Sequence, residues 1–207
     1  MTEDAFGLDA GELSVLKPLR TPAKVQDFLD TLKINFELTG DTCMSPRKVL
    51  RSGMAQCMEG AMLAALALRL HGHRPLVMDL TTNIRDVDHV VAVFKAHGRW
   101  GGISKTNHPI LRYREPVYRD IRELAMSYFH EYFMDDGRKT MRSYSKPLDL
   151  SRFDDKGWMT SEENIFYIPE FLDNYTHIPI LTRGMIAGLR RADKIEIEAT
   201  KMTEWKG

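Results

Sequence analysis

Hydrophobic residues are densest in the segment 57–70, where only Glu59, Gly60 and Arg69 interrupt a run of Ala, Leu, Met and Cys. The run is too long and too rich in Ala and Leu for a strand, which indicates a buried helix that begins at Cys57. Gly72, just after the run, suits the left-handed conformation that ends many helices. The pattern therefore predicts one central, buried helix.

Two shorter helices are predicted before the central one. Thr21 followed by Pro22, and Ser45 followed by Pro46, each place an N-cap residue before a proline at the first helical position. After Pro22, apolar residues recur at helical spacing: Val25, Phe28, Leu29 and Leu32. The segment 51–56 is then a loop that leads into the central helix.

Three strands are predicted after the central helix, over 76–80, over 89–94 and from Trp100 onward. His97-Gly98 is a suitable two-residue hairpin turn between the second and the third. Such a turn pairs Ala96 with Arg99.

The remainder of the chain predicts one more core helix and a wrapping extension. Apolar residues recur at i, i+4 and i+7 from Pro116 to about residue 134, which indicates a helix. From Lys146 the chain carries prolines and scattered aromatic residues, and the segment 184–205 suits a terminal helix. We therefore predict an α+β fold, with a helical layer on a small antiparallel sheet in residues 1–145 and a C-terminal extension, 146–207, within one compact domain.

Composition narrows the classes of function. The 207 residues contain 29 Lys and Arg and 29 Asp and Glu, so no net charge points to nucleic acid or an anionic membrane. Two cysteines do not make a disulfide framework, and the N-terminal residues lack a signal-peptide pattern, so we expect a cytoplasmic protein. No pattern predicts a metal or a cofactor, and His71-Gly72-His73 is more typical of a solvated helix end.

Cys57 is the main candidate for chemistry. A helix start places unpaired N–H groups and the positive end of the helix dipole beside it, which favours both a thiolate and an oxyanion. His89 begins the second predicted strand and is the candidate base. The alternative for Cys57 is a small buried apolar residue, and we expect that structural role for Cys43.

The ordered pieces of this central region resemble the transglutaminase-like (papain-like cysteine hydrolase) superfamily. They are a helix from Thr21, a short helix over 46–53, the segment 56–61 around Cys57, a helix end over 69–75, and the strand from His89 that leads to Gly98-Arg99-Trp100. The resemblance, which is of bacterial type, implies a papain-like core in which the cysteine is the nucleophile and the histidine its base. It also implies an Asp four residues after the Trp as the third catalytic residue.

This sequence has Ser104 at the position of that Asp. A serine cannot supply the negative charge that orients and stabilises an imidazolium. The hairpin register places Ser104 on the face of His89, and Asn107 on the opposite face unless a bulge intervenes. Asn107 is the chemically better substitute, because papain-like enzymes use Asn in that role. The orienting residue thus stays open between Ser104 and Asn107, and Gln56 is a weak candidate for binding an oxyanion.

We therefore expect cysteine-dependent acyl transfer, with Cys57 forming a thioester and His89 as base. Intracellular members of the superfamily are more often peptidases or amidases than cross-linking enzymes, so the resemblance implies hydrolysis of a peptide, protein or small amide. The alternative is a catalytically silent module of the same fold that binds a partner, and the missing Asp motivates it. The sequence does not determine the substrate or the oligomeric state.

Overall fold

The main sheet of the computed structural model, which describes residues 6–206, has strand order β6-β5-β4-β3-β7-β9, and β8 also pairs with β3. The strands are β3 (Leu76–Thr81), β4 (His89–Ala96), β5 (Arg99–Ile103), β6 (Arg114–Tyr118), β7 (Ser143–Ser145), β8 (Leu148–Asp149) and β9 (His177–Pro179). All of these pairings are antiparallel. The predicted α+β class is confirmed.

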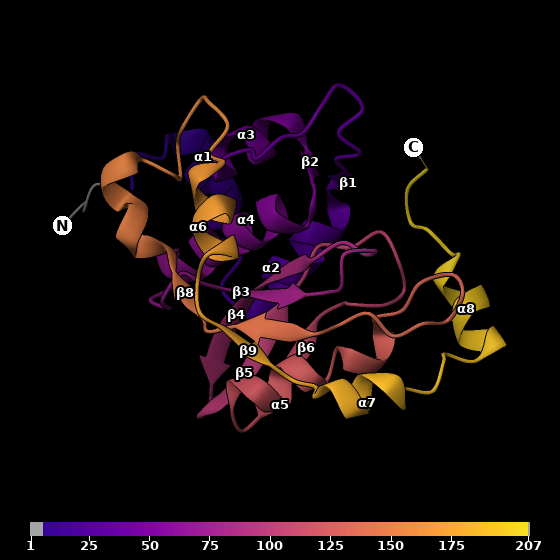
Figure 1. Cartoon of the computed structure of the whole chain (residues 1–207). Helices are drawn as coiled ribbons and strands as arrows, with labels where there is room; N and C mark the ends of the chain where they lie inside the picture. Colours follow the sequence, from indigo (N-terminus) through magenta and orange to yellow (C-terminus); the bar gives the residue numbers. More distant parts are fainter. Residues whose placement is uncertain (1–5, 207) are drawn as a thin grey trace.

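A layer of helices covers one face of the sheet (Figure 1). It consists of α1 (Ala10–Leu16), α2 (Pro22–Thr31), α3 (Pro46–Ser52), α4 (Cys57–Leu70) and α6 (Tyr167–Asp173). Near this layer, β1 (Lys33–Ile34) and β2 (Met54–Ala55) form a separate parallel pair. The helix starts at Pro22 and Pro46 are as predicted, because Thr21 and Ser45 each accept a hydrogen bond from a backbone N–H of the first turn, at 3.3 Å.

The two faces of the sheet contact different hydrophobic cores. Val77, Ala92 and Phe94 pack with the central helix α4, whereas Val91 and Val93 pack on the opposite face. That opposite face is covered by α5 (Ile121–Met126) and the 3-10 turn η1 (Phe129–Glu131). Successive side chains of β3 and β4 point to opposite faces of the sheet, and both faces are buried.

The β4–β5 hairpin forms as the sequence predicts. His97 and Gly98 have φ angles of 51° and 76°, and Ala96 pairs with Arg99. Positive φ at both central positions is the signature of the tight turn that matches the twist of a hairpin. The turn fixes the register of β5, and therefore the direction in which Ser104 leaves the sheet.

The helix predicted from Pro116 is wrong. Pro116 lies in β6, an edge strand whose single partner among the described strands is β5, and a proline there costs no ladder hydrogen bond. The helix α5 begins at Ile121, because the Asp120 side chain accepts a hydrogen bond from the Glu123 N–H at 2.8 Å.

The single terminal helix predicted over 184–205 is also wrong. The structure has two short helices there, α7 (Arg183–Ala187) and α8 (Lys194–Thr200), separated by a segment that begins at Gly188. Each has its own cap, at Thr182 and Asp193. A glycine and a second N-cap between apolar positions divide one expected helix into two.

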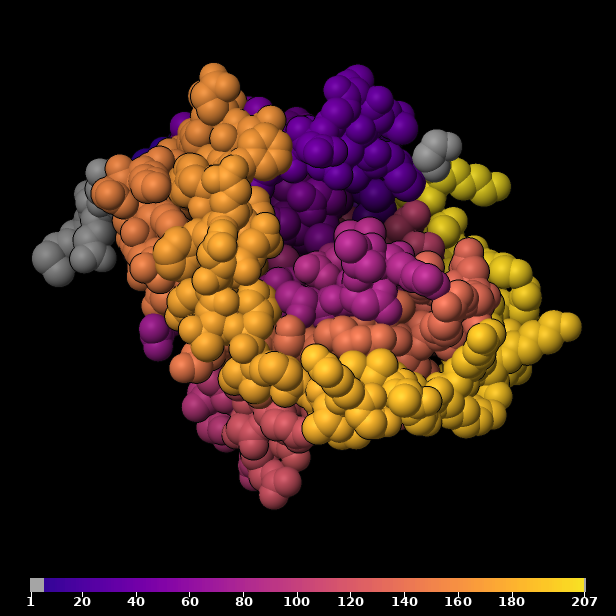
Figure 2. All heavy atoms as spheres, in the orientation of Figure 1, coloured from indigo at the N-terminus to yellow at the C-terminus, as the bar shows by residue number. Residues whose placement is uncertain are grey.

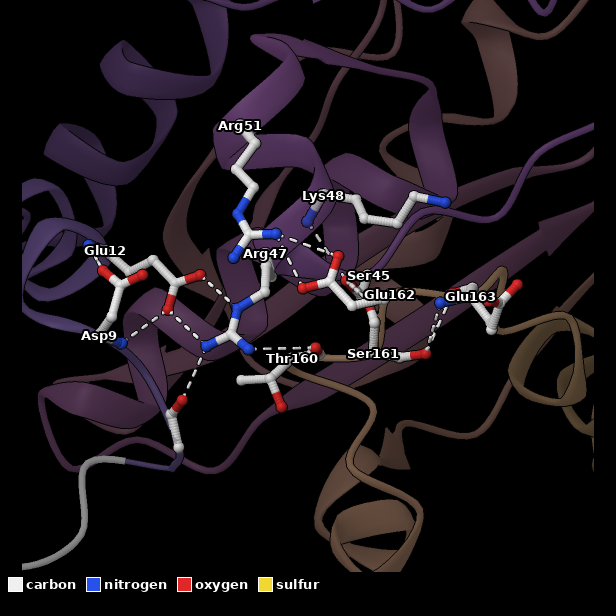
Figure 3. A network of polar contacts seen from close by, with 11 residues as sticks. Asp9, Glu12, Ser45, Arg47, Lys48, Arg51, Thr160, Ser161, Glu162 and Glu163 are labelled. Atoms are coloured by element: carbon white, nitrogen blue, oxygen red, sulfur yellow. Dashed lines mark hydrogen bonds and ion pairs between the residues drawn. The ribbon is translucent and has the colours of Figure 1, made fainter.

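The C-terminal extension is built into the core. It supplies β8 and β9 to the main sheet, the 3-10 segment η2 (Leu150–Lys156), and the fully buried Trp158. Arg47 of α3 joins it to the N-terminal helix, because its guanidinium donates to Glu12 at 2.6 and 2.9 Å and to the carbonyls of Gly7 and Thr160 (Figure 3). Among the described residues, no helix is both long enough and apolar enough to cross a membrane.

Replacing Gly60 by alanine is expected to destabilise the protein. A Cβ at this position of α4 would lie 2.5 Å from the Cβ of Lys105, which is 1% exposed and cannot easily move. We expect a loss of about 1–3 kcal/mol in the free energy of unfolding, despite the better helix propensity of alanine. Urea titration measures it, with Gly184→Ala as control, because the atom nearest to a Cβ there is 4.0 Å away. An unchanged midpoint in Gly60→Ala would show that the helix and Lys105 separate readily.

Candidate active site

Cys57 is the first residue of α4, and hydrogen bonds fix the start of that helix. The Gln56 N–H donates to the Glu59 carboxyl group at 2.9 Å, and the Gln56 side-chain oxygen accepts from the Met58 N–H at 2.6 Å. The first bond is half of a capping box between Gln56 and Glu59, and the second satisfies another N–H of the first helical turn. The backbone that carries the thiol is therefore held from both sides.

The Glu59 carboxyl group is fully buried and anchors a loop to this helix start. It also accepts hydrogen bonds from the Met44 N–H and the Thr42 hydroxyl, both at 2.8 Å, and from the Asn35 amide at 3.1 Å. Sequence reasoning missed this role. The available signal was a Gln at position 56 followed by a Glu three residues later, which is a capping-box pattern.

The electrostatic environment of the Cys57 thiol differs from our expectation. Burial raises the pKa of the thiol above its ordinary value, and hydrogen bonds from the N–H groups of Val90 and Met58 offset this only in part. A preformed thiolate, which the helix start alone would favour, is therefore not supported. The cause is desolvation, which disfavours the charged form of a thiol.

His89 is 7% exposed and is bound through Nε2 to the Ser104 hydroxyl at 2.7 Å. The Ser104 hydroxyl in turn donates to the Leu111 carbonyl at 2.5 Å. A carbonyl only accepts, so the one hydrogen of Ser104 is used there, and its oxygen must accept from His89. The neutral imidazole therefore carries its hydrogen on Nε2 and leaves Nδ1 as the basic nitrogen. Burial lowers the pKa of His89 to about 4, so the ring is neutral at physiological pH.

Gln26 of α2 holds Ser104 in place. Its side-chain oxygen accepts from the Ser104 N–H and its amide donates to the Ser104 carbonyl, both at 2.9 Å. These residues are 78 positions apart in the chain. Sequence reasoning missed Gln26, because no local pattern connects an amide on one helix with the end of a distant strand.

The structure brings Ser104 to His89 and takes Asn107 elsewhere. Both ends of the Asn107 amide bind the backbone of Trp205, with its nitrogen donating at 3.0 Å and its oxygen accepting at 2.8 Å. Asn107 thus binds the C-terminal segment and not His89. Of the two residues that the sequence left open for orienting His89, the structure places Ser104 against the ring. Ser104 can fix the ring tautomer but brings no negative charge to it.

Cys57 lies between two hollows on the surface. The first, of about 460 Å³, is lined by Cys57 and His89 together with Thr106, His108 and Tyr132, among others. The second, of about 320 Å³, adjoins it, and Cys57, Val87 and Asp88 line both. A substrate that reaches the thiol therefore has space on either side of it.

Gln56 has one group free to act on a substrate. Its oxygen is bound to the Met58 N–H, and within residues 6–206 its amide nitrogen donates no hydrogen bond. Gln56 lines the second hollow beside Cys57, whose own N–H, at the first position of the helix, has no intrahelical partner. These two groups are the candidate donors to an oxyanion. Cys43 is 1% exposed, and burial raises the pKa of its thiol to about 12, which suits the structural role predicted for it.

Comparison with protein-family models and with curated protein sequences found no match to this chain. Within the described part of the chain, no group of three or more His, Cys, Asp and Glu side chains is arranged to hold a metal ion. The geometry around Cys57 and His89 is therefore the feature of this chain that bears on its function.

Proposed function

We propose that the protein catalyses acyl transfer, in the form of amide or peptide hydrolysis, through a thioester on Cys57, and that its core is transglutaminase-like. The observation that carries the proposal is that Cys57 and His89 line one hollow, with His89 held by Ser104 so that Nδ1 is its free basic nitrogen. Nucleophile, base and orienting group are the parts that covalent catalysis by cysteine requires.

In the first half of the reaction, His89 Nδ1 takes the thiol proton as the Cys57 sulfur attacks the acyl carbon. The Cys57 N–H and the Gln56 amide stabilise the oxyanion of the tetrahedral intermediate. His89 then gives its proton to the leaving nitrogen, the C–N bond breaks, and the acyl group stays on sulfur as a thioester. Because both groups are neutral beforehand, His89 acts as a general base during attack and not as the partner of a standing thiolate.

In the second half, His89 takes a proton from water as the water oxygen attacks the thioester. The C–S bond breaks, the carboxylic acid leaves, and the proton returns to the Cys57 sulfur. His89 thus acts as a base toward the thiol and an acid toward the leaving amine in the first half, and as a base toward water and an acid toward the Cys57 sulfur in the second. The protein ends unchanged.

A second candidate is a silent module of the same fold that binds a partner. Two observations favour it: the third position holds the uncharged Ser104, and burial raises the pKa of the Cys57 thiol. A module of this kind would keep the hollows and lose the chemistry.

Incubation with p-nitrophenyl acetate tests the proposal. We expect a burst of nitrophenolate, close to one equivalent, and one acetyl group on the peptide that contains Cys57. Cys57→Ala should lose both signals, whereas Cys43→Ala should keep them because Cys43 is buried and lines neither hollow. A slow reaction with no burst, at the same rate in Cys57→Ala, would contradict the enzyme and favour the silent module.

A further inference from the structure

Asp79 of β3 is a buried carboxylate with one unused oxygen. Asp79 is 2% exposed, and its Oδ2 forms a hydrogen bond with His177 Nε2 at 3.0 Å. Within the part of the chain that the structure describes, Oδ1 has no hydrogen-bond partner. Leaving a buried acceptor unpaired is costly, so such an atom indicates a donor that arrives from outside.

The geometry of His177 keeps that oxygen free. Its Nδ1 lies 3.0 Å from the Tyr175 carbonyl, so the ring is held between this carbonyl and Asp79 Oδ2. A carbonyl only accepts, which places a hydrogen on Nδ1 and fixes the plane of the ring. His177 therefore binds Asp79 Oδ2 and cannot turn toward Oδ1.

Asp79 lines the second hollow beside Cys57. The other carboxylates of this lining are Glu37, Asp88 and Asp173, none of which lies in an ion pair between described residues, and no lysine or arginine contributes to it. The chain has equal numbers of acidic and basic residues, so this concentration of one sign is local. In Figure 2 the three segments that carry these residues, indigo, magenta and orange, meet on one face of the molecule.

We propose that the second hollow is a subsite for a positively charged nitrogen group of the substrate, an alkylammonium or guanidinium, whose N–H donates to Asp79 Oδ1 with Asp88 and Asp173 at the rim. The proposal rests on the proposed function, since Cys57 at the edge of the hollow is what makes its occupant part of a substrate. It assigns the substrate class as an acyl compound with a basic nitrogen near the bond that Cys57 attacks.

The charges around Asp79 support this assignment. Burial raises the pKa of Asp79 to about 6, the His177 hydrogen bond opposes that shift, and the charge of Asp88 adds to it. The pKa of Asp173 is raised as well, by burial and then by the charge of Asp88. The carboxylates thus disfavour one another's charged forms, and a cation placed among them relieves that repulsion.

Calorimetric titration of the Cys57→Ala protein with n-butylammonium or n-butylguanidinium tests the subsite without any reaction. We expect either cation to bind and the neutral 1-pentanol, of similar size, not to bind. Asp79→Asn in this background should weaken binding about tenfold to hundredfold, because a charge-assisted hydrogen bond is lost. Asp173→Asn, an exposed substitution that leaves the core intact, should weaken it about twofold to threefold.

Glu163→Gln is the matched control, since it removes one exposed charge that does not line the hollow. Equal affinity for butylammonium and 1-pentanol, or unchanged affinity in both Asp79→Asn and Asp173→Asn, would overturn the subsite. The p-nitrophenyl acetate burst of the unmodified protein is measured separately. Cation binding without that burst supports the subsite and contradicts the enzyme, and a burst without cation binding does the reverse.

Discussion

Glu59→Ala is expected to lose a large part of the stability of the fold. The substitution leaves the N–H groups of Gln56 and Met44 without acceptors at a fully buried carboxyl site, and removes one of the acceptors of the Asn35 and Thr42 side chains. Each unsatisfied buried group costs roughly 1–3 kcal/mol. We expect a loss of about 4 kcal/mol or more, against a total of roughly 5–15 kcal/mol for a domain.

Urea unfolding followed by circular dichroism measures this loss. Glu59→Gln has nearly the same shape but presents an amide NH₂ group to donors, so we expect it to fall between Glu59→Ala and the unmodified protein. Glu170→Ala, also on a helix but exposed, should change the free energy of unfolding by less than about 0.5 kcal/mol. A Glu59→Ala midpoint close to that of Glu170→Ala would show that water replaces the carboxyl group.

Local signals explain why much of the fold was predictable. An N-cap next to a proline placed the starts of α2 and α3, and His97-Gly98 fixed the β4–β5 register through two residues with positive φ. That register was enough to place Ser104, and not Asn107, on the side of His89. Each of these predictions depends on residues within a few positions of one another, where backbone preference decides the outcome.

The helix predicted from Pro116 shows where periodicity misleads. Apolar spacing suited a helix there, but exposure along β6 alternates between half-buried and exposed residues, as in an edge strand. The better signal was Asp120 followed by Glu123, a cap that begins the helix at Ile121. Where a proline lies early in an apolar pattern, as Pro116 does here, the next N-cap residue is a better guide to the start of the helix than the pattern itself.

The site contacts that the sequence did not reveal connect distant segments. Gln26 binds Ser104 from 78 positions away, and His177 binds Asp79 from 98 positions away. Neither pair has a pattern in the chain, because the packing of α2 and the addition of β9 to the sheet bring them together. The burial of the Cys57 thiol also results from packing between distant segments. The sequence around the helix start therefore did not reveal that the pKa of this thiol is raised.

His89→Gln is expected to lower the rate of Cys57 acetylation by p-nitrophenyl acetate by about 10²- to 10⁴-fold, the usual contribution of a general base. In the unmodified protein the rate should fall as the pH is lowered, with a midpoint near pH 4. Burial lowers the pKa of His89 to about 4, and below that pH the ring is protonated and cannot act as a base. It should then stay level to about pH 8, because the pKa of the thiol is raised and little thiolate forms below that. An acid limb near pH 6.5, the ordinary histidine value, would show that the ring is solvated and contradict the buried base.

Ser104→Ala separates positioning from chemistry. Loss of the hydroxyl removes the only hydrogen-bond partner of His89 Nε2 among the described residues, so both neutral tautomers become accessible. The acetylation rate should fall by roughly tenfold, which is less than the loss expected in His89→Gln. Nitrogen-15 spectra of histidine-labelled protein provide the independent readout, with the His89 signals identified by their absence in His89→Gln. The unmodified protein should show a hydrogen on Nε2 and none on Nδ1, and Ser104→Ala a mixture. A hydrogen on Nδ1 in the unmodified protein would contradict the proposal, because Nδ1 could then not accept the Cys57 proton, and the Ser104 hydroxyl would donate to Nε2 instead of to the Leu111 carbonyl.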